Sequence, residues 1–130
     1  MILGIGIDLC AVARMEKGLQ KPAFAARVFA PQEQAFWQDF SDKHRAESAA
    51  AAFAAKEAFL KAAGTGLGGF ALAELAVLHK PSGAPYFCFF GDAARFIEQI
   101  HLTAHLSLTH DGGLAAAYVI LEQNSAGTCD

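Results

Sequence analysis

The chain has 130 residues, of which 54% are hydrophobic and 18% are charged. This length favours one domain with a single core, and this composition excludes a disordered chain. The net charge of −3 does not indicate a nucleic-acid-binding protein, and the sequence has no apolar run of about 18 residues that would span a membrane.

The N-terminal segment and the cysteines indicate where in the cell the protein is expected. The segment MILGIGIDLC has no basic leader and carries Asp8 inside its apolar run, so it is a poor signal peptide. Cys10, Cys88 and Cys129 are odd in number and widely spaced, which argues against a disulfide framework and a structural zinc site. We therefore expect reduced cysteines and a cytoplasmic protein with no membrane or nucleic-acid partner.

The first segment, ILGIGIDL, predicts a strand. Ile5 and Ile7 share one face of it, and Gly4, Gly6 and Asp8 share the other. The strand therefore carries a carboxylate near its end.

Three short helical segments are expected over residues 11–19, 21–29 and 31–40. Pro31 occupies a favourable first helical position, and the third segment presents Phe36, Trp37 and Phe40 for burial. A long helix is expected next, from Asp42 as N-cap through residue 63, with Gly64 as its stop.

The C-terminal half predicts four strands and one helix. Residues 72–80 and 84–90 form two strands around the turn PSGAP, and 92–100 form a helix with Asp92 as its cap. Residues 101–109 and 114–121 form a hairpin around HDGG. The order indicates one α+β domain over 1–122, followed by a polar tail over 123–130.

Two charges stand out in the long helix. Glu57 lies beside the apolar stripe of Phe53 and Leu60, and Lys61 follows four residues later. Taken alone, they favour a weak surface ion pair. However, a carboxylate beside a packed stripe has to be paired, hydrogen-bonded or bound to a metal.

Asp8 raises the same choice on the first strand. Its simpler interpretation is a carboxylate that caps the following helix. If Asp8 and Glu57 lie close together beside Lys61, they make an oxygen site of the kind that Mg²⁺ prefers, completed by water and phosphate oxygens.

Two other features are weak when taken alone. The run GTGLGG over residues 64–69 matches neither a Walker motif nor GxGxxG, so its glycines can be a helix cap and a loop. His110 is expected at the tip of the predicted hairpin, where a lone histidine is more often a solvated turn residue. Arg14, Lys17, Lys21 and Arg27 form a local basic patch on a mildly acidic chain.

Several segments together resemble one family in the same order. They are GIGIDL at 4–9, FAAKEAFLKAAGTG at 53–66, SGAPY at 82–86, and SLTHD at 107–111 before AAAYVI at 115–120. The chain is similar throughout to the holo-acyl-carrier-protein synthases, small phosphopantetheinyl transferases of fatty-acid synthesis. The run KEA-x-x-KA-x-GTG is the most specific part of this resemblance.

The resemblance implies a reaction and a fold. The phosphopantetheine arm of coenzyme A is transferred to a serine hydroxyl of an apo acyl carrier protein, with release of adenosine 3′,5′-bisphosphate. The implied cofactor is Mg²⁺, and the implied assembly is a homotrimer with sites between neighbouring subunits. The fold is that of the 4′-phosphopantetheinyl transferases, with antiparallel strands packed against a long helix.

The resemblance also implies roles for individual residues. Asp8 and Glu57 match metal-binding carboxylates, and Lys61 matches a lysine that contacts the diphosphate region. These three residues are the catalytic candidates. The candidates for coenzyme binding are Lys61 together with Gly64, Thr65, Gly66, Gly83, Pro85 and His110. Arg14 and Arg27 match basic positions of the family, and with Lys17 and Lys21 they are candidates for docking the acidic carrier protein.

Some choices stay open at this point. Either a water on the metal or Glu57 acting through a water could accept the serine proton. Many family members have a basic residue where this chain has Ala52, and a lysine where it has Ala84. Lys43, His44 and Arg45 are candidates to compensate for the first loss. A non-catalytic coenzyme A or nucleotide-binding module, or a purely structural trimer subunit, is the alternative to an enzyme.

Overall fold

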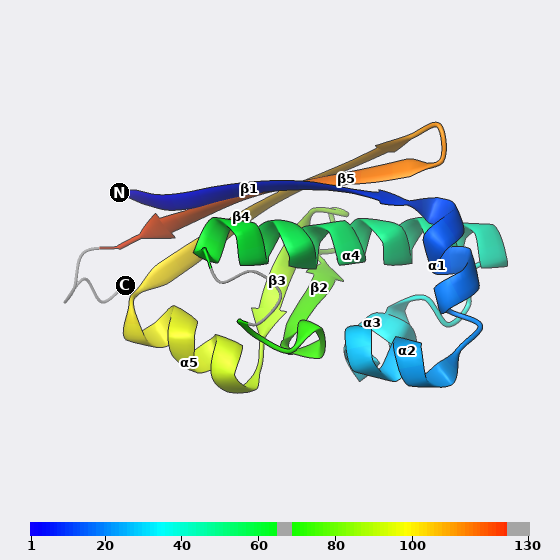
Figure 1. Ribbon diagram of the computed structural model, residues 1–130, viewed down its shortest axis with the longest axis horizontal. Helices are drawn as coiled ribbons and strands as arrows, with labels where there is room; N and C mark the ends of the chain where they lie inside the picture. The colour runs from blue at the N-terminus through cyan, green and yellow to red at the C-terminus, as the bar shows by residue number, and fades with distance from the viewer. Residues whose placement is uncertain (65–68, 125–130) are drawn as a thin grey trace.

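The computed structural model describes residues 1–64 and 69–124. It confirms one α+β domain, arranged in three layers (Figure 1). A three-stranded sheet forms the first layer, and the long helix α4 (Asp42–Ala63) packs along one face of it. The remaining helices and a two-stranded hairpin lie on the other side of α4. None of the helices within the described residues is long and apolar enough to cross a membrane.

The three-stranded sheet is antiparallel with the strand order β1 (Ile2–Ala11), β5 (Leu114–Gln123), β4 (Leu102–Asp111). The predicted hairpin joins β4 to β5. Its turn residues Gly112 and Gly113 have φ values of 58° and 80°, which a glycine pair adopts without steric cost. The two edges of this sheet are β1 and β4, so they lie about 10 Å apart across β5.

The glycines of β1 explain how closely α4 approaches the sheet. A Cβ atom at Gly6 would collide with the backbone carbonyl of Ala58, and one at Gly4 with the carbonyl of Ala62. The strand therefore alternates as predicted: its glycine face packs against the alanines of α4, whereas Ile5 and Ile7 point away from the helix and are exposed.

The ends of α4 agree with the predicted range. Gly64 ends the helix in the left-handed conformation, with φ of 75°. The predicted N-cap was wrong by one residue, because the Ser41 hydroxyl accepts the hydrogen bond from the His44 backbone N–H and Asp42 is the first helical residue.

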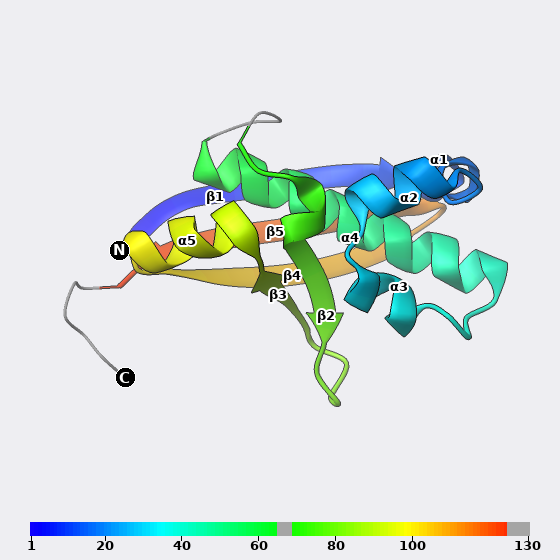
Figure 2. The same cartoon turned by 90° about the horizontal axis from the view of Figure 1, so that it is seen from below.

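Three short helices, α1 (Val12–Gly18), α2 (Pro22–Val28) and α3 (Pro31–Phe36), cover one end of α4 (Figure 2). Burial in the third segment differs from the prediction. Trp37 is buried and packs edge-to-face on the buried Phe29 ring, Phe40 is half-buried, and Phe36 is 42% exposed. Helix α3 ends at Phe36, so the next residue turns inward and takes the core position.

The second half of the chain forms a hairpin and a helix below α4. A short 3-10 helix η2 (Leu72–Glu74) precedes β2 (Leu75–His79), which pairs with β3 (Pro85–Phe89), and α5 (Gly91–Gln99) follows. The strand predicted over residues 72–80 therefore begins three residues later in the structure, at Leu75. Asp92 lies in the first turn of α5 but is not its cap; Phe90 takes the N-cap position, without a side-chain bond.

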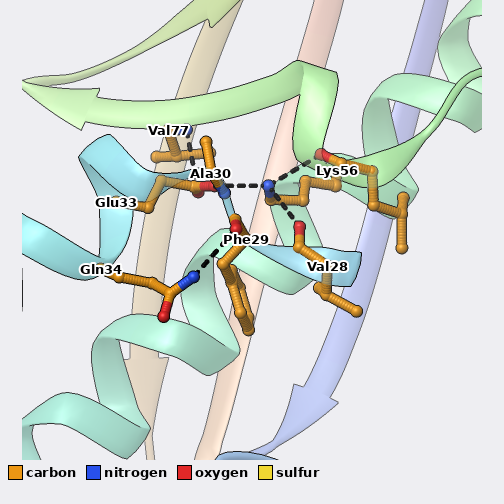
Figure 3. Close-up of polar contacts among 8 residues, drawn as sticks. Val28, Phe29, Ala30, Glu33, Gln34, Lys56 and Val77 are labelled. Carbon is orange, nitrogen blue, oxygen red and sulfur yellow. Dashed lines mark hydrogen bonds and ion pairs between the residues drawn. The ribbon is translucent and has the colours of Figure 1, made fainter. Parts of the chain in front are cut away.

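A buried ion pair joins α3 to α4 (Figure 3). The Lys56 ammonium donates hydrogen bonds to Glu33 Oε1 at 2.6 Å and to the carbonyls of Val28 and Leu72, each at 2.9 Å. Three acceptors require three N–H donors, so Lys56 is protonated, although burial lowers its pKa. Its charge is therefore compensated within the core.

The Glu33 carboxylate is satisfied in the same way. Oε1 also accepts from the Ala30 N–H at 2.9 Å, and Oε2 accepts from the Val77 N–H at 3.0 Å. Burial raises the pKa of Glu33, and the Lys56 charge and these donors oppose that shift. The pair thus ties α2, α3, η2 and β2 to the centre of the long helix.

Candidate active site

Lys61 reaches from α4 to the first strand. Its ammonium donates hydrogen bonds to Asp8 Oδ1 and to the Ile7 carbonyl, both at 2.9 Å. Within the described residues its ion-pair partner is Asp8 and not Glu57, so the interpretation of Glu57 and Lys61 as a helix surface pair is wrong. Asp8 does not cap the next helix either, because α1 has no side-chain cap at its start.

Glu57 lies close enough to this pair for the charges of both Asp8 and Lys61 to affect its pKa. Burial raises the pKa of the Glu57 carboxyl, and the negative charge of Asp8 raises it further. Arg14 and Lys61 act in the opposite direction but do not cancel the shift. Two carboxylates therefore share one electrostatic environment, in which a cation would be stabilised by both.

Arg14 connects this pair of carboxylates to the basic patch. Its guanidinium lies over the Phe53 ring, 4.6 Å from the ring centroid, which holds α1 against α4 beside Glu57. Lys17, Lys21 and Arg27 follow along α1 and α2, and all are exposed. The basic patch therefore begins at the candidate site and extends away from it over two helices.

The donor set at Asp8 and Glu57 fits a magnesium ion. Magnesium is commonly held in proteins by one or two carboxylates, with water and substrate phosphate oxygens completing its shell. In the described parts of the chain, no three His, Cys, Asp or Glu side chains gather closely enough to hold a metal by themselves. The two carboxylates thus fit a metal that shares its shell with a phosphate substrate, and they do not fit a closed structural site.

His110 lies on the other edge of the sheet. In the strand register, Asp8 of β1 pairs with Ala117 of β5, and Ala117 pairs with Leu108 of β4. His110 is two residues further along β4. His110 lines a cavity of about 210 Å³ between α4, β2 and β4. Within one chain, the structure therefore does not bring His110 to Asp8, Glu57 and Lys61.

The remaining predicted site residues are distributed around the β2–β3 hairpin and the end of α4. Pro85 pairs with His79, which lines the same cavity as His110, whereas Gly83 lies in the exposed turn that projects from the body (Figure 2). Gly64 is the exposed C-cap of α4. Thr65 and Gly66 lie outside the described residues.

Sequence reasoning missed part of this geometry. Arg45, one of the candidates to compensate for Ala52, donates instead to the carbonyls of Trp37, Gln38 and Phe40 and so fastens the connection before α4. His79 had been given no role, yet it lines the cavity that borders Ala52. The sequence could not have shown this, because His79 lies on β2 and Ala52 on α4, and residues so far apart in the sequence form no local spacing pattern.

Comparisons with known proteins give a consistent result. The model of the 4′-phosphopantetheinyl transferase superfamily matches residues 4–119. A holo-[acyl-carrier-protein] synthase of Trichlorobacter lovleyi is 48% identical over 126 residues, covering 94% of this chain and 98% of the relative.

Solved structures agree with the sequence comparison. The crystal structure of the Neisseria meningitidis holo-[acyl-carrier-protein] synthase aligns with a TM-score of 0.82 at 30% identity, covering 95% of this chain and 100% of the other. The Bacillus anthracis synthase, solved in complex with CoA (3′,5′-ADP), aligns with a TM-score of 0.81 at 31% identity, covering 95% and 99%. The chain therefore belongs to the 4′-phosphopantetheinyl transferase superfamily and, within it, to the holo-[acyl-carrier-protein] synthase family of enzymes.

Proposed function

We propose that this protein transfers the 4′-phosphopantetheine group of coenzyme A to a serine of an apo acyl carrier protein. The reaction is Mg²⁺-dependent, releases adenosine 3′,5′-bisphosphate and takes place in the cytoplasm as part of fatty-acid synthesis. The observation that carries the proposal is the cluster of Asp8, Glu57 and Lys61 beside the basic patch of α1 and α2. The names of the relatives support both substrates.

The cluster suits phosphoryl transfer, which mainly needs positioning and neutralisation of a diphosphate. Lys61 is exposed, so its ammonium can exchange the Asp8 carboxylate for a phosphate oxygen. Asp8 and Glu57 would hold Mg²⁺, which supplies Lewis-acid stabilisation of the diphosphate when bound. Glu57 acting through a water is one of the groups that would accept the serine proton.

We propose further that the active unit is a homotrimer in which a second copy completes the site. Asp8 and His110 lie on opposite edges of the sheet, so one chain presents two separate half-sites. The face of the sheet away from α4 carries an apolar surface, and in Figure 1 no described element lies against it. This surface consists of the exposed side chains of Leu3, Ile5, Ile7, Leu9, Leu114 and Tyr118.

Substitution of Ile7 by lysine tests the assembly. The Ile7 side chain is 63% exposed in one chain, and Tyr118 lies directly opposite it in the register of β1 and β5. A lysine there is tolerated by a single chain but disfavours burial between copies. We expect Ile7→Lys to shift the mass measured by light scattering from trimer to monomer and to abolish transfer. Glu98→Lys, at an exposed position of α5, is the control and should stay trimeric. A trimeric, active Ile7→Lys variant would contradict this interface.

Substitution of Arg14 by alanine tests the docking surface. We expect KM for the carrier protein to rise about five- to tenfold while KM for coenzyme A changes little, because a surface charge contributes mainly to encounter with an acidic partner. KM of the variant should grow less steeply with salt than that of the wild type. Arg95→Ala, on α5, is the matched control. An unchanged carrier-protein KM in Arg14→Ala would remove Arg14 from the docking surface.

The metal requirement is tested directly by transfer with coenzyme A in the presence of Mg²⁺ or EDTA. The proposal predicts transfer with Mg²⁺, loss of transfer with EDTA, and recovery when Mg²⁺ is added in excess. Transfer that is insensitive to EDTA would contradict the role assigned to Asp8 and Glu57.

A further inference from the structure

The contact between Lys61 and Asp8 depends on how closely α4 lies along the first strand (Figure 1). A Cβ atom at Gly6 would collide with the carbonyl of Ala58, which lies about one turn before Lys61 on the helix. At this separation the Lys61 side chain spans from helix to strand, and its ammonium donates to Asp8 Oδ1 and to the Ile7 carbonyl, both at 2.9 Å. The contact is therefore built into the packing of α4 against β1.

The positive charge of Lys61 offsets part of the negative charge that the two carboxylates offer to a cation. Asp8 and Glu57 carry two negative charges when ionised, and Lys61 places one positive charge in contact with Asp8. The effect of Lys61 reaches Glu57 as well, since it lowers the pKa that burial and Asp8 raise. Like charges a few ångströms apart repel one another, and least weakly where water is partly excluded. The Asp8 side chain is only 19% exposed, so Lys61 opposes the binding of any other cation there.

The same ammonium is free to exchange Asp8 for a ligand. The Lys61 side chain is 55% exposed, and in the described parts of the chain its three N–H donors have two acceptors, Asp8 and Ile7. A diphosphate offers several charged oxygens, which accept strong hydrogen bonds from an ammonium. Once Lys61 donates to such oxygens, Asp8 regains its full negative charge.

We infer that Lys61 and a divalent cation compete for Asp8, and that a diphosphate ligand ends this competition by taking the ammonium away from the carboxylate. This inference rests on the proposed function for the identity of the cation and of the diphosphate. The contact is autoinhibitory toward a cation alone, so Asp8 and Glu57 bind the cation weakly without the diphosphate and tightly with it. By linkage, the cation raises the affinity for the diphosphate by the same factor.

The first experiment measures binding of the metal alone. Mn²⁺ is titrated into the whole protein after removal of bound metal, and free Mn²⁺ is read from its electron paramagnetic resonance signal. Mn²⁺ suits the test because it takes the same carboxylate and water ligands as Mg²⁺. We expect Lys61→Met to bind Mn²⁺ about tenfold more tightly than the wild type, a gain that a folding defect cannot produce. An unchanged or weaker affinity in Lys61→Met would overturn the inference.

Two variants separate the local charge from other effects. Lys61→Arg keeps the positive charge and should bind Mn²⁺ within about twofold of the wild type. Lys43→Met removes an exposed positive charge near the other end of the same helix and should also leave Mn²⁺ affinity unchanged. If Lys43→Met tightened binding as much as Lys61→Met, net charge and not the contact with Asp8 would be the cause, and the inference would be overturned.

The second experiment tests the exchange of acceptors by repeating the Mn²⁺ titration with coenzyme A. Coenzyme A is raised until the Mn²⁺ affinity of each protein stops changing, and Mn²⁺ bound by coenzyme A in solution is subtracted. We expect coenzyme A to increase the Mn²⁺ affinity of the wild type by about tenfold more than that of Lys61→Met, because only the wild type has a contact to release. Equal increases in the two proteins would overturn the exchange.

These outcomes separate the inference from the proposed function. If the wild type and Lys61→Met bind Mn²⁺ equally well while transfer requires Mg²⁺, only the competition for Asp8 is wrong. If neither protein binds Mn²⁺, even with coenzyme A, the metal role that the proposed function assigns to Asp8 and Glu57 is wrong together with the inference.

Discussion

Replacement of Glu57 by glutamine is expected to lower the rate of phosphopantetheine transfer at least about 100-fold. The amide keeps the shape of the side chain but removes one of the two negative charges that would hold the metal. Because burial and Asp8 both disfavour the ionised form of Glu57, the fold does not depend on that charge. The variant should therefore unfold at the same temperature as the wild type, or slightly above it.

Glu98→Gln, at an exposed position on α5, is the matched control and should keep full activity. Raising the Mg²⁺ concentration should partly restore Glu57→Gln, because a weakened site fills at higher metal concentration. A Glu57→Gln variant with the full rate at low Mg²⁺ would show that Glu57 does not bind the metal.

The largest effect on stability is expected from Lys56→Met. This change leaves the Glu33 carboxylate buried without its counter-ion and removes the donor from the carbonyls of Val28 and Leu72. Breaking a buried ion pair on one side typically costs about 3–5 kcal/mol of unfolding free energy. Chemical denaturation of the purified variant measures this loss directly.

Lys43→Met, at an exposed position of the same helix, should change stability by less than about 0.5 kcal/mol. Combining Lys56→Met with Glu33→Leu should not restore wild-type stability. The double variant removes the unpaired charge, but the Ala30 and Val77 N–H groups also lose their acceptor. Wild-type stability of Lys56→Met alone would mean that the buried pair contributes nothing to the fold.

Much of the fold could be predicted from local patterns. The alternation of glycine and isoleucine in β1 indicated two unlike faces, and the structure shows why: only glycine allows α4 to lie so close to the strand. The limits of α4 followed from an alanine-rich run that stops at Gly64. The errors lie at the ends of helices: Ser41 rather than Asp42 caps α4, and Phe36, which was predicted to be buried with Trp37, is exposed at the end of α3.

The candidate site could be predicted only in part. Lys56 has apolar residues on both adjoining turns of α4, which is a sequence signal for burial, but its partner Glu33 is 23 positions away and gives no matching signal. Three histidines line the cavity between α4, β2 and β4, namely His44, His79 and His110. They come from three different elements that meet only after folding. The resemblance implied a site between neighbouring subunits that includes Asp8 and His110, and a single chain holds these two residues on opposite edges of its sheet.

The central claim is that this protein modifies an acyl carrier protein with the arm of coenzyme A. It is tested most directly by the intact mass of a purified apo acyl carrier protein after incubation with this protein, coenzyme A and Mg²⁺. We predict a gain of one phosphopantetheine group per carrier, absent when the acceptor serine is replaced by alanine. An unchanged mass, under conditions in which a related synthase modifies the same carrier completely, would contradict the claim.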